Sequence, residues 1–326
     1  RQRKMHGCEG TAEVKTGVII ALDVGGTTVK SALCNDSGDL LTGISTTPVD
    51  SKASKATILE SFNEIVTILS RAAAKAGLPL SGLALAFPGP FDYERGICLI
   101  RGVEKYEALY GMNLKRFFRS EVLADGSIPI LFDADSWAFA RGQYHKGAAR
   151  GAERFIGLTI GTGLGSAFME RGSIVENERG IPPYGWIGNL PCGKGILDDK
   201  VSRRGILGRY EELTGGAHGS LDVEDLFNLA ESGDGNCIEV FSETGILLAT
   251  ALAPFIEAFH PDCIVMGGKI SGAFKYMAPA LNRRLEELLE KGNVPEILKA
   301  TGGDSCTLSG VALYLAERYL EGGRTC

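Results

Sequence analysis

Two short segments rich in glycine and threonine are the features of this sequence that could do chemistry. The first is Gly25-Gly26-Thr27-Thr28 and the second is Gly161-Thr162-Gly163, and each lies between two apolar runs. A turn of glycine and threonine exposes backbone N–H groups and hydroxyls without a bulky side chain, so it can surround a phosphate closely. The alternative for either turn alone is a tight hairpin that needs glycine for a positive φ. Two such turns in one chain favour two halves that hold one polyphosphate from opposite sides.

Neither turn matches a common nucleotide-binding motif. The run Gly161-Thr162-Gly163-Leu164-Gly165 lacks the third glycine of a dinucleotide-binding fingerprint at the required spacing, and a predicted strand rather than a helix follows it. The sequence also has no Gly-Lys-Ser/Thr, which a P-loop requires. The predicted phosphate site is therefore made of two strand–turn–strand units.

Two aspartates stand at the ends of apolar runs. Asp133 follows the run 128–132 and precedes a predicted helix over 135–145. Because Asp135 is the better candidate for the N-cap of that helix, we expect Asp133 to be free to act as a general base for an attacking hydroxyl. Asp23 precedes the first turn, where a carboxylate beside phosphate needs a cation between them, so we expect it to hold Mg²⁺ through water. Either aspartate could instead cap the adjacent helix or turn.

A third glycine motif, Gly267-Gly268-Lys269, follows the apolar run 263–266. Paired glycines would let a flat ring lie against the backbone, which predicts a nucleoside-binding turn; an ordinary turn between a strand and a helix is the alternative. Lys30, beyond the first turn, either offsets phosphate charge or is simply exposed.

The elements that must position these residues occur in the same order in both halves of the chain. The first half predicts strands over 18–24, 29–35, 40–46, 83–87 and 128–132 and a helix over 55–77. The second half predicts strands over 154–160, 166–170 and 263–266, a long loop over 177–202, and helices over 223–232, 237–259, 274–289 and 308–320. This repetition predicts a duplicated α/β unit. Ligands of such folds bind at the carboxyl ends of the strands, in the crevice between the halves.

Length and composition limit the classes of function. A chain of 326 residues predicts two domains, and its 44% hydrophobic and 23% charged residues are those of an ordinary globular protein. The net charge of −6 argues against nucleic acid as a partner, and no segment reads as a membrane span or signal peptide. The eight cysteines form no C-x-x-C pair, which favours a reducing cytoplasm. Residues 1–16 are expected to be a disordered extension.

Taken in order, the motifs resemble those of the ROK family (repressor, open reading frame, kinase) in the sugar kinase/Hsp70/actin superfamily. The resemblance is carried by Asp23-Val24-Gly25-Gly26-Thr27-Thr28, Phe87-Pro88-Gly89-Pro90-Phe91-Asp92, Asp133, Gly161-Thr162-Gly163-Leu164-Gly165, Val265-Met266-Gly267-Gly268 and Leu308-Ser309-Gly310-Val311-Ala312. It implies two ribonuclease H-like (actin-like ATPase) domains, each a mixed five-stranded sheet with helices on both faces, and a cleft between them. The expected domains are 17–134, with the last helix 308–322 packed back on it, and 135–307.

The family resemblance also implies a chemistry, which is ATP-dependent transfer of phosphate to a sugar hydroxyl with Asp133 at the catalytic aspartate, in a homodimer. The sugar and zinc motifs depart from the family pattern. Phe132 replaces an Asn, and Trp186 and Asn189 replace the Glu and His of the sugar motif. The zinc site needs that His and three Cys, of which only Cys192 remains recognisable, so no zinc is predicted.

The substitution of aromatic for polar groups predicts a changed substrate. An aromatic ring stacks on a sugar but does not select its hydroxyls, so we expect a different sugar or a larger glycoside. The segment 101–106 could supply polar contacts or could be a solvated loop. The candidate substrate-binding residues are Pro88, Gly89, Glu104, Phe132, Trp186 and Asn189.

The first hypothesis is thus a cytoplasmic carbohydrate kinase that uses ATP and Mg²⁺ and takes a small-molecule sugar. The second hypothesis is a sugar-sensing or regulatory protein with weak catalysis, motivated by Phe132 and Trp186. About 17 residues precede the first predicted strand, too few for a helix-turn-helix domain, which disfavours a repressor. A chaperone or an actin-like polymer is also disfavoured because the chain lacks the extra subdomains of such proteins.

Overall fold

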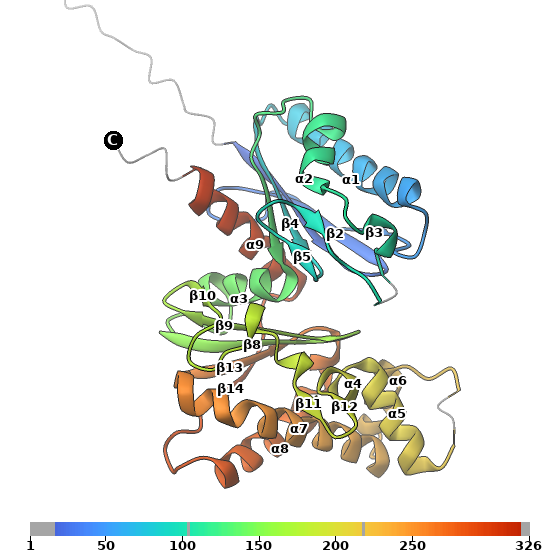
Figure 1. Ribbon diagram of the computed structural model, residues 1–326, viewed down its shortest axis with the longest axis vertical. Coiled ribbons are helices and arrows are strands. Elements are labelled where there is room, and N and C mark those ends of the chain that lie inside the picture. Colours follow the sequence, from blue (N-terminus) through green and yellow to red (C-terminus); the bar gives the residue numbers. More distant parts are fainter. Residues whose placement is uncertain (1–16, 103–104, 217–218, 321–326) are drawn as a thin grey trace, which may run out of the picture.

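Two five-stranded sheets with the same strand order and directions form the framework of the protein in a computed structural model. The structure describes residues 17–102, 105–216 and 219–320. The N-terminal sheet has the order β3-β2-β1-β4-β7 and the C-terminal sheet the order β10-β9-β8-β13-β14. In each sheet the first three strands are antiparallel, and the two later strands add in parallel. The predicted duplication is confirmed, and Figure 1 shows the two sheets in separate lobes.

The strands alternate their side chains between the two faces of each sheet, as strand geometry requires. The N-terminal sheet contains β1 (Val18–Val24), β2 (Thr28–Cys34), β3 (Ser45–Pro48), β4 (Leu80–Phe87) and β7 (Ile130–Ala134). The C-terminal sheet contains β8 (Arg154–Ile160), β9 (Leu164–Glu170), β10 (Ser173–Val175), β13 (Cys263–Gly267) and β14 (Glu296–Lys299). Two small hairpins are formed by β5 (Phe91–Asp92) with β6 (Ile97–Cys98) and by β11 (Pro191–Cys192) with β12 (Gly195–Ile196).

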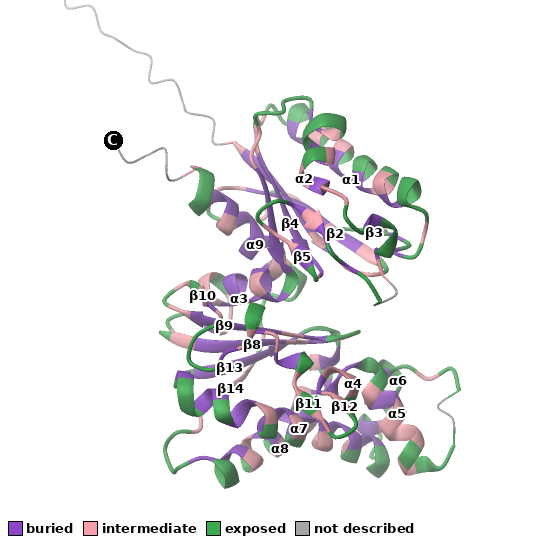
Figure 2. Ribbon diagram, viewed as in Figure 1, coloured by how far each residue is buried: buried purple, intermediate pink, exposed green. Residues whose placement is uncertain are grey.

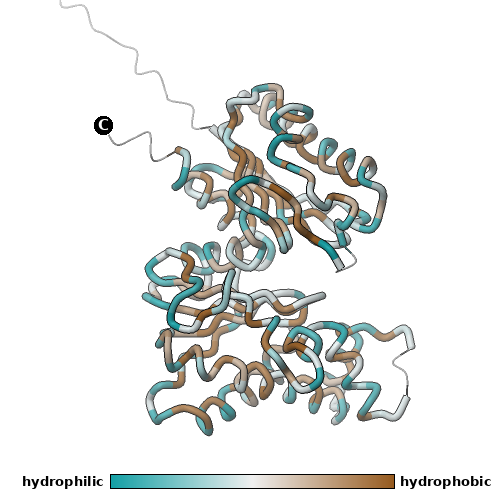
Figure 3. The backbone as a smooth tube through the Cα atoms, viewed as in Figure 1, coloured by the Kyte–Doolittle hydropathy of each residue, from teal (hydrophilic) through white to brown (hydrophobic). Residues whose placement is uncertain are grey.

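Helices cover both faces of each sheet. On the N-terminal sheet, α1 (Lys55–Lys75) packs on one face and α9 (Asp304–Leu315) on the other. On the C-terminal sheet, α7 (Gly235–Phe259) and α8 (Phe274–Leu288) pack on one face and α3 (Asp135–Lys146) on the other. Figure 2 shows the central strands of each sheet buried between these helices, and Figure 3 shows hydrophobic segments along these strands. The remaining α-helices are α2 (Leu114–Phe117), α4 (Asp198–Val201), α5 (Arg203–Thr214) and α6 (Val223–Glu231).

The two lobes are joined where α3 crosses α9. A Cβ atom on Gly142 of α3 would lie 1.9 Å from the carbonyl oxygen of Cys306, and one on Gly310 of α9 would lie 2.0 Å from the carbonyl oxygen of Ala138. Glycine at both places therefore lets the two helix backbones touch. Since α3 covers one sheet and α9 covers the other, this crossing links the lobes.

Several predicted elements differ in extent from the observed ones; for example, β4 begins at Leu80 rather than 83, and β7 runs over Ile130–Ala134 rather than 128–132. The third strand, expected over 40–46, begins only at Ser45. Before it, Leu40 forms an isolated bridge with Cys34, and the hydroxyl of Thr42 accepts the N–H of Leu33. The last helix begins at Asp304, four residues before its expected start. The expected loop over 177–202 contains β11, β12 and α4.

One helix, α7, is long and apolar enough to cross a membrane, although the sequence predicts no such span. Its most apolar 18-residue window has a mean hydropathy of 1.4, and half of that window is buried inside the protein. Twelve α7 residues are buried, and nearly all the apolar ones belong to the core of the C-terminal domain, which is the usual reason for such a composition in a core helix.

Candidate active site

Three parallel strands of the N-terminal sheet end at one edge and bring two carboxylates to it. Asp23 of β1 is in register with Ala86 of β4, which is in register with Asp133 of β7. Residues directly opposite one another point to the same face, so both aspartates face the side covered by α3 and α9. Two strand spacings separate their Cα atoms by about 10 Å. On the strand between them, the residue in register is the small Ala86.

A backbone hydrogen bond closes each glycine/threonine turn, across residues 25–28 in the first sheet and across the shorter span 161–163 in the second. The N–H of Gly25 donates to the carbonyl oxygen of Thr28 at 2.9 Å, and the N–H of Gly161 donates to that of Gly163 at 3.0 Å. Thr27 and Thr162, at the tips, are exposed. None of the turn glycines has a positive φ, so the backbone conformation does not demand glycine in either turn.

Packing within the protein does not demand glycine at the centre of the turns either. A Cβ atom on Gly161 would meet nothing within 4 Å, and one on Gly26 would make only an ordinary contact of 3.7 Å with the hydroxyl of Ser51. Gly25 and Gly163 are different, since a Cβ atom would lie 2.9 Å from the carbonyl oxygen of Thr28 and 3.1 Å from a carboxylate oxygen of Asp198, respectively. The open space over Gly26 and Gly161 is what a ligand needs in order to approach the backbone closely.

Asp133 is buried and ion-paired, in contrast to the expectation that it is free. Its side chain is 1% exposed, and Arg141 Nε donates to its Oδ2 at 3.0 Å. Burial raises the pKa of Asp133, and the positive charge and hydrogen bond of Arg141 oppose that shift. Asp135 is also not the N-cap: Ala134 occupies that position, and Asp135 is the exposed first residue of α3, whose carboxylate accepts the N–H of Ser136. The position of the Asp133 carboxylate is therefore fixed by the end of β7 and by Arg141, and not by a helix cap at Asp135.

Asp23 lies in a negatively charged and partly buried position. Burial raises its pKa from 3.8 to about 6, with Asp135 and Asp304 adding to the shift and Lys30 opposing it. Lys30 pairs with Asp304 at the start of α9 at 2.5 Å, so its charge is shared with a carboxylate. A carboxylate that the protein holds at such a cost fits a cation-binding position.

The predicted nucleoside motif adjoins the second turn. A Cβ atom on Gly268, which has φ 86°, would lie 2.4 Å from the carbonyl oxygen of Ile160, the residue before Gly161. A Cβ atom on Gly267 would lie 2.5 Å from the ring of Phe139. Both glycines therefore have a structural reason, and Lys269 beside them is exposed. Their place at the end of β13, parallel to β8, puts them next to the second turn.

An aromatic chain crosses from one domain to the other near these carboxylates. The ring centroids of Tyr93 and Trp137 lie 5.8 Å apart, those of Trp137 and Tyr184 lie 6.1 Å apart, and those of Tyr184 and Trp186 lie 5.3 Å apart. The carboxylates of Asp135 and Asp133 contribute, after burial, to a raised pKa of Tyr93. Tyr93, Trp137 and Tyr184 are not among the predicted site residues, because nothing in their spacing along the sequence indicates that they converge.

The other candidate substrate residues are distributed unevenly. Gly89, preceded by the buried Pro88, contacts Trp186 so closely that a Cβ atom on it would lie 2.5 Å from the indole ring. Asn189 is exposed beyond that turn. Phe132 points to the opposite face of the sheet from Asp133, into a cluster of phenylalanine rings, with a centroid distance of 5.0 Å to Phe91. Glu104 lies outside the described residues.

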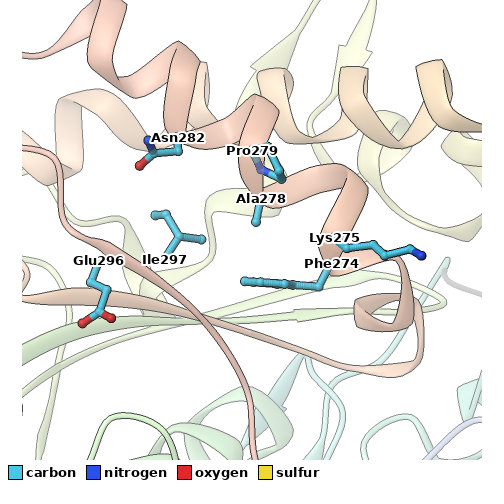
Figure 4. Close-up of a pocket in the computed structure, with 7 residues that line it drawn as sticks. All are labelled: Phe274, Lys275, Ala278, Pro279, Asn282, Glu296 and Ile297. Atoms are coloured by element: carbon cyan, nitrogen blue, oxygen red, sulfur yellow. The ribbon is translucent and has the colours of Figure 1, made fainter.

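Among the described residues, neither a metal-binding cluster nor a pocket offers a better candidate for the active site than the strand edge with Asp23 and Asp133. Within residues 17–102, 105–216 and 219–320, no group of three or more His, Cys, Asp or Glu side chains is placed to hold a metal. The absence of zinc remains a prediction, and Mg²⁺ needs fewer protein ligands because phosphates supply the rest. A hollow of about 510 Å³ lies between α8 and β14, and Figure 4 shows its mainly apolar lining. It is on the outer side of the C-terminal domain, away from the strand ends.

Comparison with known proteins agrees with the architecture. The family model described as ROK family matches residues 19–318. The N-acetyl-D-glucosamine kinase of Haemophilus influenzae is 28% identical over 323 residues, covering 91% of this chain and 99% of its own. The ROK hexokinase of Thermus thermophilus (25% identity, TM-score 0.72) aligns with 94% of this chain and 100% of its own. The ROK glucokinase of Streptomyces griseus in complex with glucose and AMPPNP (20% identity, TM-score 0.73) aligns with 93% and 100%. The fold is that of the actin-like ATPases, and the chain belongs to the ROK family.

Proposed function

We propose that the protein is a sugar kinase that transfers the γ-phosphate of ATP to a hydroxyl of a sugar. The observation that carries this proposal is the open space over Gly26 and Gly161, two turn glycines that neither backbone conformation nor packing requires. Family membership supports it, since the similar proteins include a kinase for N-acetyl-D-glucosamine and a glucokinase with glucose and an ATP analogue.

Each group of site residues has its own role in the proposed reaction. Backbone N–H groups of the two turns, other than those of Gly25 and Gly161, which donate within the turns, bind the phosphates. Gly267, Gly268 and Lys269 flank the nucleoside. Asp23 would hold Mg²⁺ through water, and the ion would supply positive charge that offsets the charge of the phosphates. Asp133 accepts the proton of the sugar hydroxyl as its oxygen attacks the γ-phosphorus, and the bond from phosphorus to the ADP oxygen breaks. The separation of about 10 Å between the two aspartates matches a phosphoryl group placed between them once part of the cover of Asp133 has moved.

The aromatic chain Tyr93–Trp137–Tyr184–Trp186 is our candidate surface for the sugar. Tyr184 is 39% exposed, with φ 59°, and is held by two hydrogen bonds: its N–H donates to Glu176 and its carbonyl oxygen accepts from the indole of Trp137. A left-handed tyrosine that is fixed and exposed is typical of a binding position. Such a surface favours acceptors with an apolar ring face.

The test is a panel of sugars, including glucose and N-acetyl-D-glucosamine, with ATP and Mg²⁺, followed by ADP release. Turnover with at least one sugar is expected. In Asp133→Asn the turnover number should fall by about 10²- to 10⁴-fold, the usual size of a general-base contribution, with nucleotide binding retained. ADP release that no sugar stimulates would contradict the kinase proposal, and unchanged turnover in the variant would remove Asp133 from the mechanism.

A sugar sensor with weak catalysis is the second candidate. The ion pair between Asp133 and Arg141 favours it, since the pair already occupies the carboxylate that would accept the proton of the sugar hydroxyl. Sugar-dependent turnover of ATP would exclude a purely sensing role. We also propose that the protein is a cytoplasmic homodimer. Light scattering of the purified protein would measure the number of subunits.

A further inference from the structure

A buried arginine contacts the proposed base from the neighbouring helix. Arg141 lies two turns into α3, its side chain is 9% exposed, and its Nε is 3.0 Å from Asp133 Oδ2. Its guanidinium group lies over the ring of Tyr314 of α9, 3.7 Å from the centroid. The arginine is therefore fixed on one side by the strand end and on the other by the last helix.

Stability alone gives a poor reason for this pair. Burying two charges costs desolvation that their attraction rarely exceeds, and well-packed apolar residues often serve as well or better. The chain instead places a cation against the one carboxylate on β7, at the edge where the site lies. The cost of burying this ion pair at the proposed site therefore points to a role in function.

We propose that Arg141 is a positioning residue for the base, which holds the Asp133 carboxylate in place and in its ionised form until the sugar arrives. This inference rests on the proposed function. Because Asp133 is 1% exposed, a sugar hydroxyl can touch it only after part of its cover moves. Until the sugar arrives, Arg141 offsets the negative charge of Asp133, as water would do at an exposed carboxylate.

The groups around Asp133 determine the sign of the expected effect. Arg141 and Asp135 of α3 interact with the carboxylate of Asp133, and so does Tyr93, which follows β5. Tyr314 of α9 contacts Arg141. Asp23 stands two strands away from Asp133. Burial and Asp135 raise the pKa of Asp133, whereas Arg141 lowers it. Without Arg141 the hydrogen bond with the backbone of Ala134 is the lowering influence that is left against burial and Asp135, so the base is protonated at a higher pH.

The experiment is the dependence of kcat/KM on pH for Arg141→Gln, with whichever sugar of the panel is turned over. The acid limb should move to higher pH, so that activity falls by about 10- to 100-fold on that limb and recovers in alkaline buffer. Arg141→Lys, which keeps the charge but not the planar contact with Tyr314, should recover part of the shift. Arg318→Gln is the matched control, since Arg318 also lies over Tyr314, 6.0 Å from its centroid, and pairs with Glu94.

Two further measurements separate positioning from folding. In an Asp133→Asn background, Arg141→Gln should cause no additional loss of turnover, because there is no base left to position. Titration of ¹³C-labelled aspartate carboxyl groups by NMR, with Asp133→Asn as the assignment blank, should show a higher pKa of Asp133 in Arg141→Gln. An equal loss at every pH, or an unmoved carboxyl titration, would overturn the inference. A moved titration in a protein without sugar-dependent ADP release would instead overturn the proposed function.

Discussion

At the scale of single residues, Asp23 combines a cost in stability with a proposed role in binding. Its pKa in the folded protein is raised to about 6, so the folded state binds this proton more tightly than the unfolded chain does. The resulting stabilisation is complete below pH 3.8 and is lost as the pH rises through about 6. At neutral pH the ionised carboxylate is therefore tolerated rather than stabilising.

Asp23→Asn should raise the free energy of unfolding of the ligand-free protein at pH 7.5 by up to about 3 kcal/mol, the equivalent of the raised pKa. The same substitution should increase several-fold the Mg²⁺ concentration needed for half-maximal turnover. Urea unfolding between pH 4 and 8 and a magnesium titration of activity measure the two effects. An Asn variant that is less stable at pH 7.5 would show that the carboxylate stabilises the fold, and unchanged magnesium dependence would remove it from the metal site.

The residue scale also shows what the sequence could and could not indicate. The positions of Asp23 and Asp133 at strand ends follow from apolar runs that stop at a carboxylate, and the register confirms that they share one edge. The partner of Asp133 could not be predicted, because Arg141 reaches it through the angle between β7 and α3. Phe132 likewise belongs to the aromatic core because strand alternation turns it away from Asp133.

At the scale of elements, the two hairpin turns allow a substitution that separates folding from binding. Gly161→Ala and Gly26→Ala introduce a methyl group where the structure has room, at a φ that alanine adopts. The thermal midpoint should therefore stay within a few degrees of the unchanged protein. Nucleotide affinity should fall about tenfold or more, because the methyl group stands where a phosphate approaches.

The control for the turns is Gly43→Ala, a glycine that also has no atom within 4 Å of an added Cβ but lies between β2 and β3. Calorimetric titration with an ATP analogue and Mg²⁺ gives the affinities, and differential scanning calorimetry gives the midpoints. Equal affinities for all three variants and the starting protein would mean that phosphates do not approach Gly26 and Gly161.

Elements with strong periodicity could be predicted, and those without it could not. Helix α1 was expected over 55–77 and runs over Lys55–Lys75, because its apolar residues recur at helical spacing. The pieces β11, β12 and α4 were missed, because two-residue strands and a four-residue helix carry no periodic pattern. The twelve-residue α5 was missed as well, since the two residues that it buries, Ile206 and Leu207, are adjacent and form no helical repeat. The sequence also did not indicate that α9 begins at Asp304, because its first residues are polar, as those of the preceding loop are, and add no apolar repeat.

At the scale of the whole molecule, the duplicated sheets are joined by a crossing of glycine-containing helices. The residues that we assign to one reaction come from both lobes, with Asp23, Gly26 and Asp133 on the N-terminal sheet and Gly161 on the C-terminal one. The geometry between them depends on the angle at which α3 crosses α9. A change at this crossing should therefore affect stability and catalysis together.

Gly142→Ala tests this dependence, because its methyl group would lie 1.9 Å from the carbonyl oxygen of Cys306 and must force the helices apart. Overpacking of this kind costs about 1–3 kcal/mol, so the thermal midpoint should fall. Gly208→Ala in α5 is the matched control: it is also a helical glycine, but its Cβ atom would meet nothing within 4 Å, and alanine there should stabilise the helix by up to about 1 kcal/mol. Opposite signs for the two variants in chemical denaturation, with a raised KM for ATP only in Gly142→Ala, are expected. If Gly142→Ala is as stable and as active as the starting protein, the lobes do not depend on this contact for their arrangement.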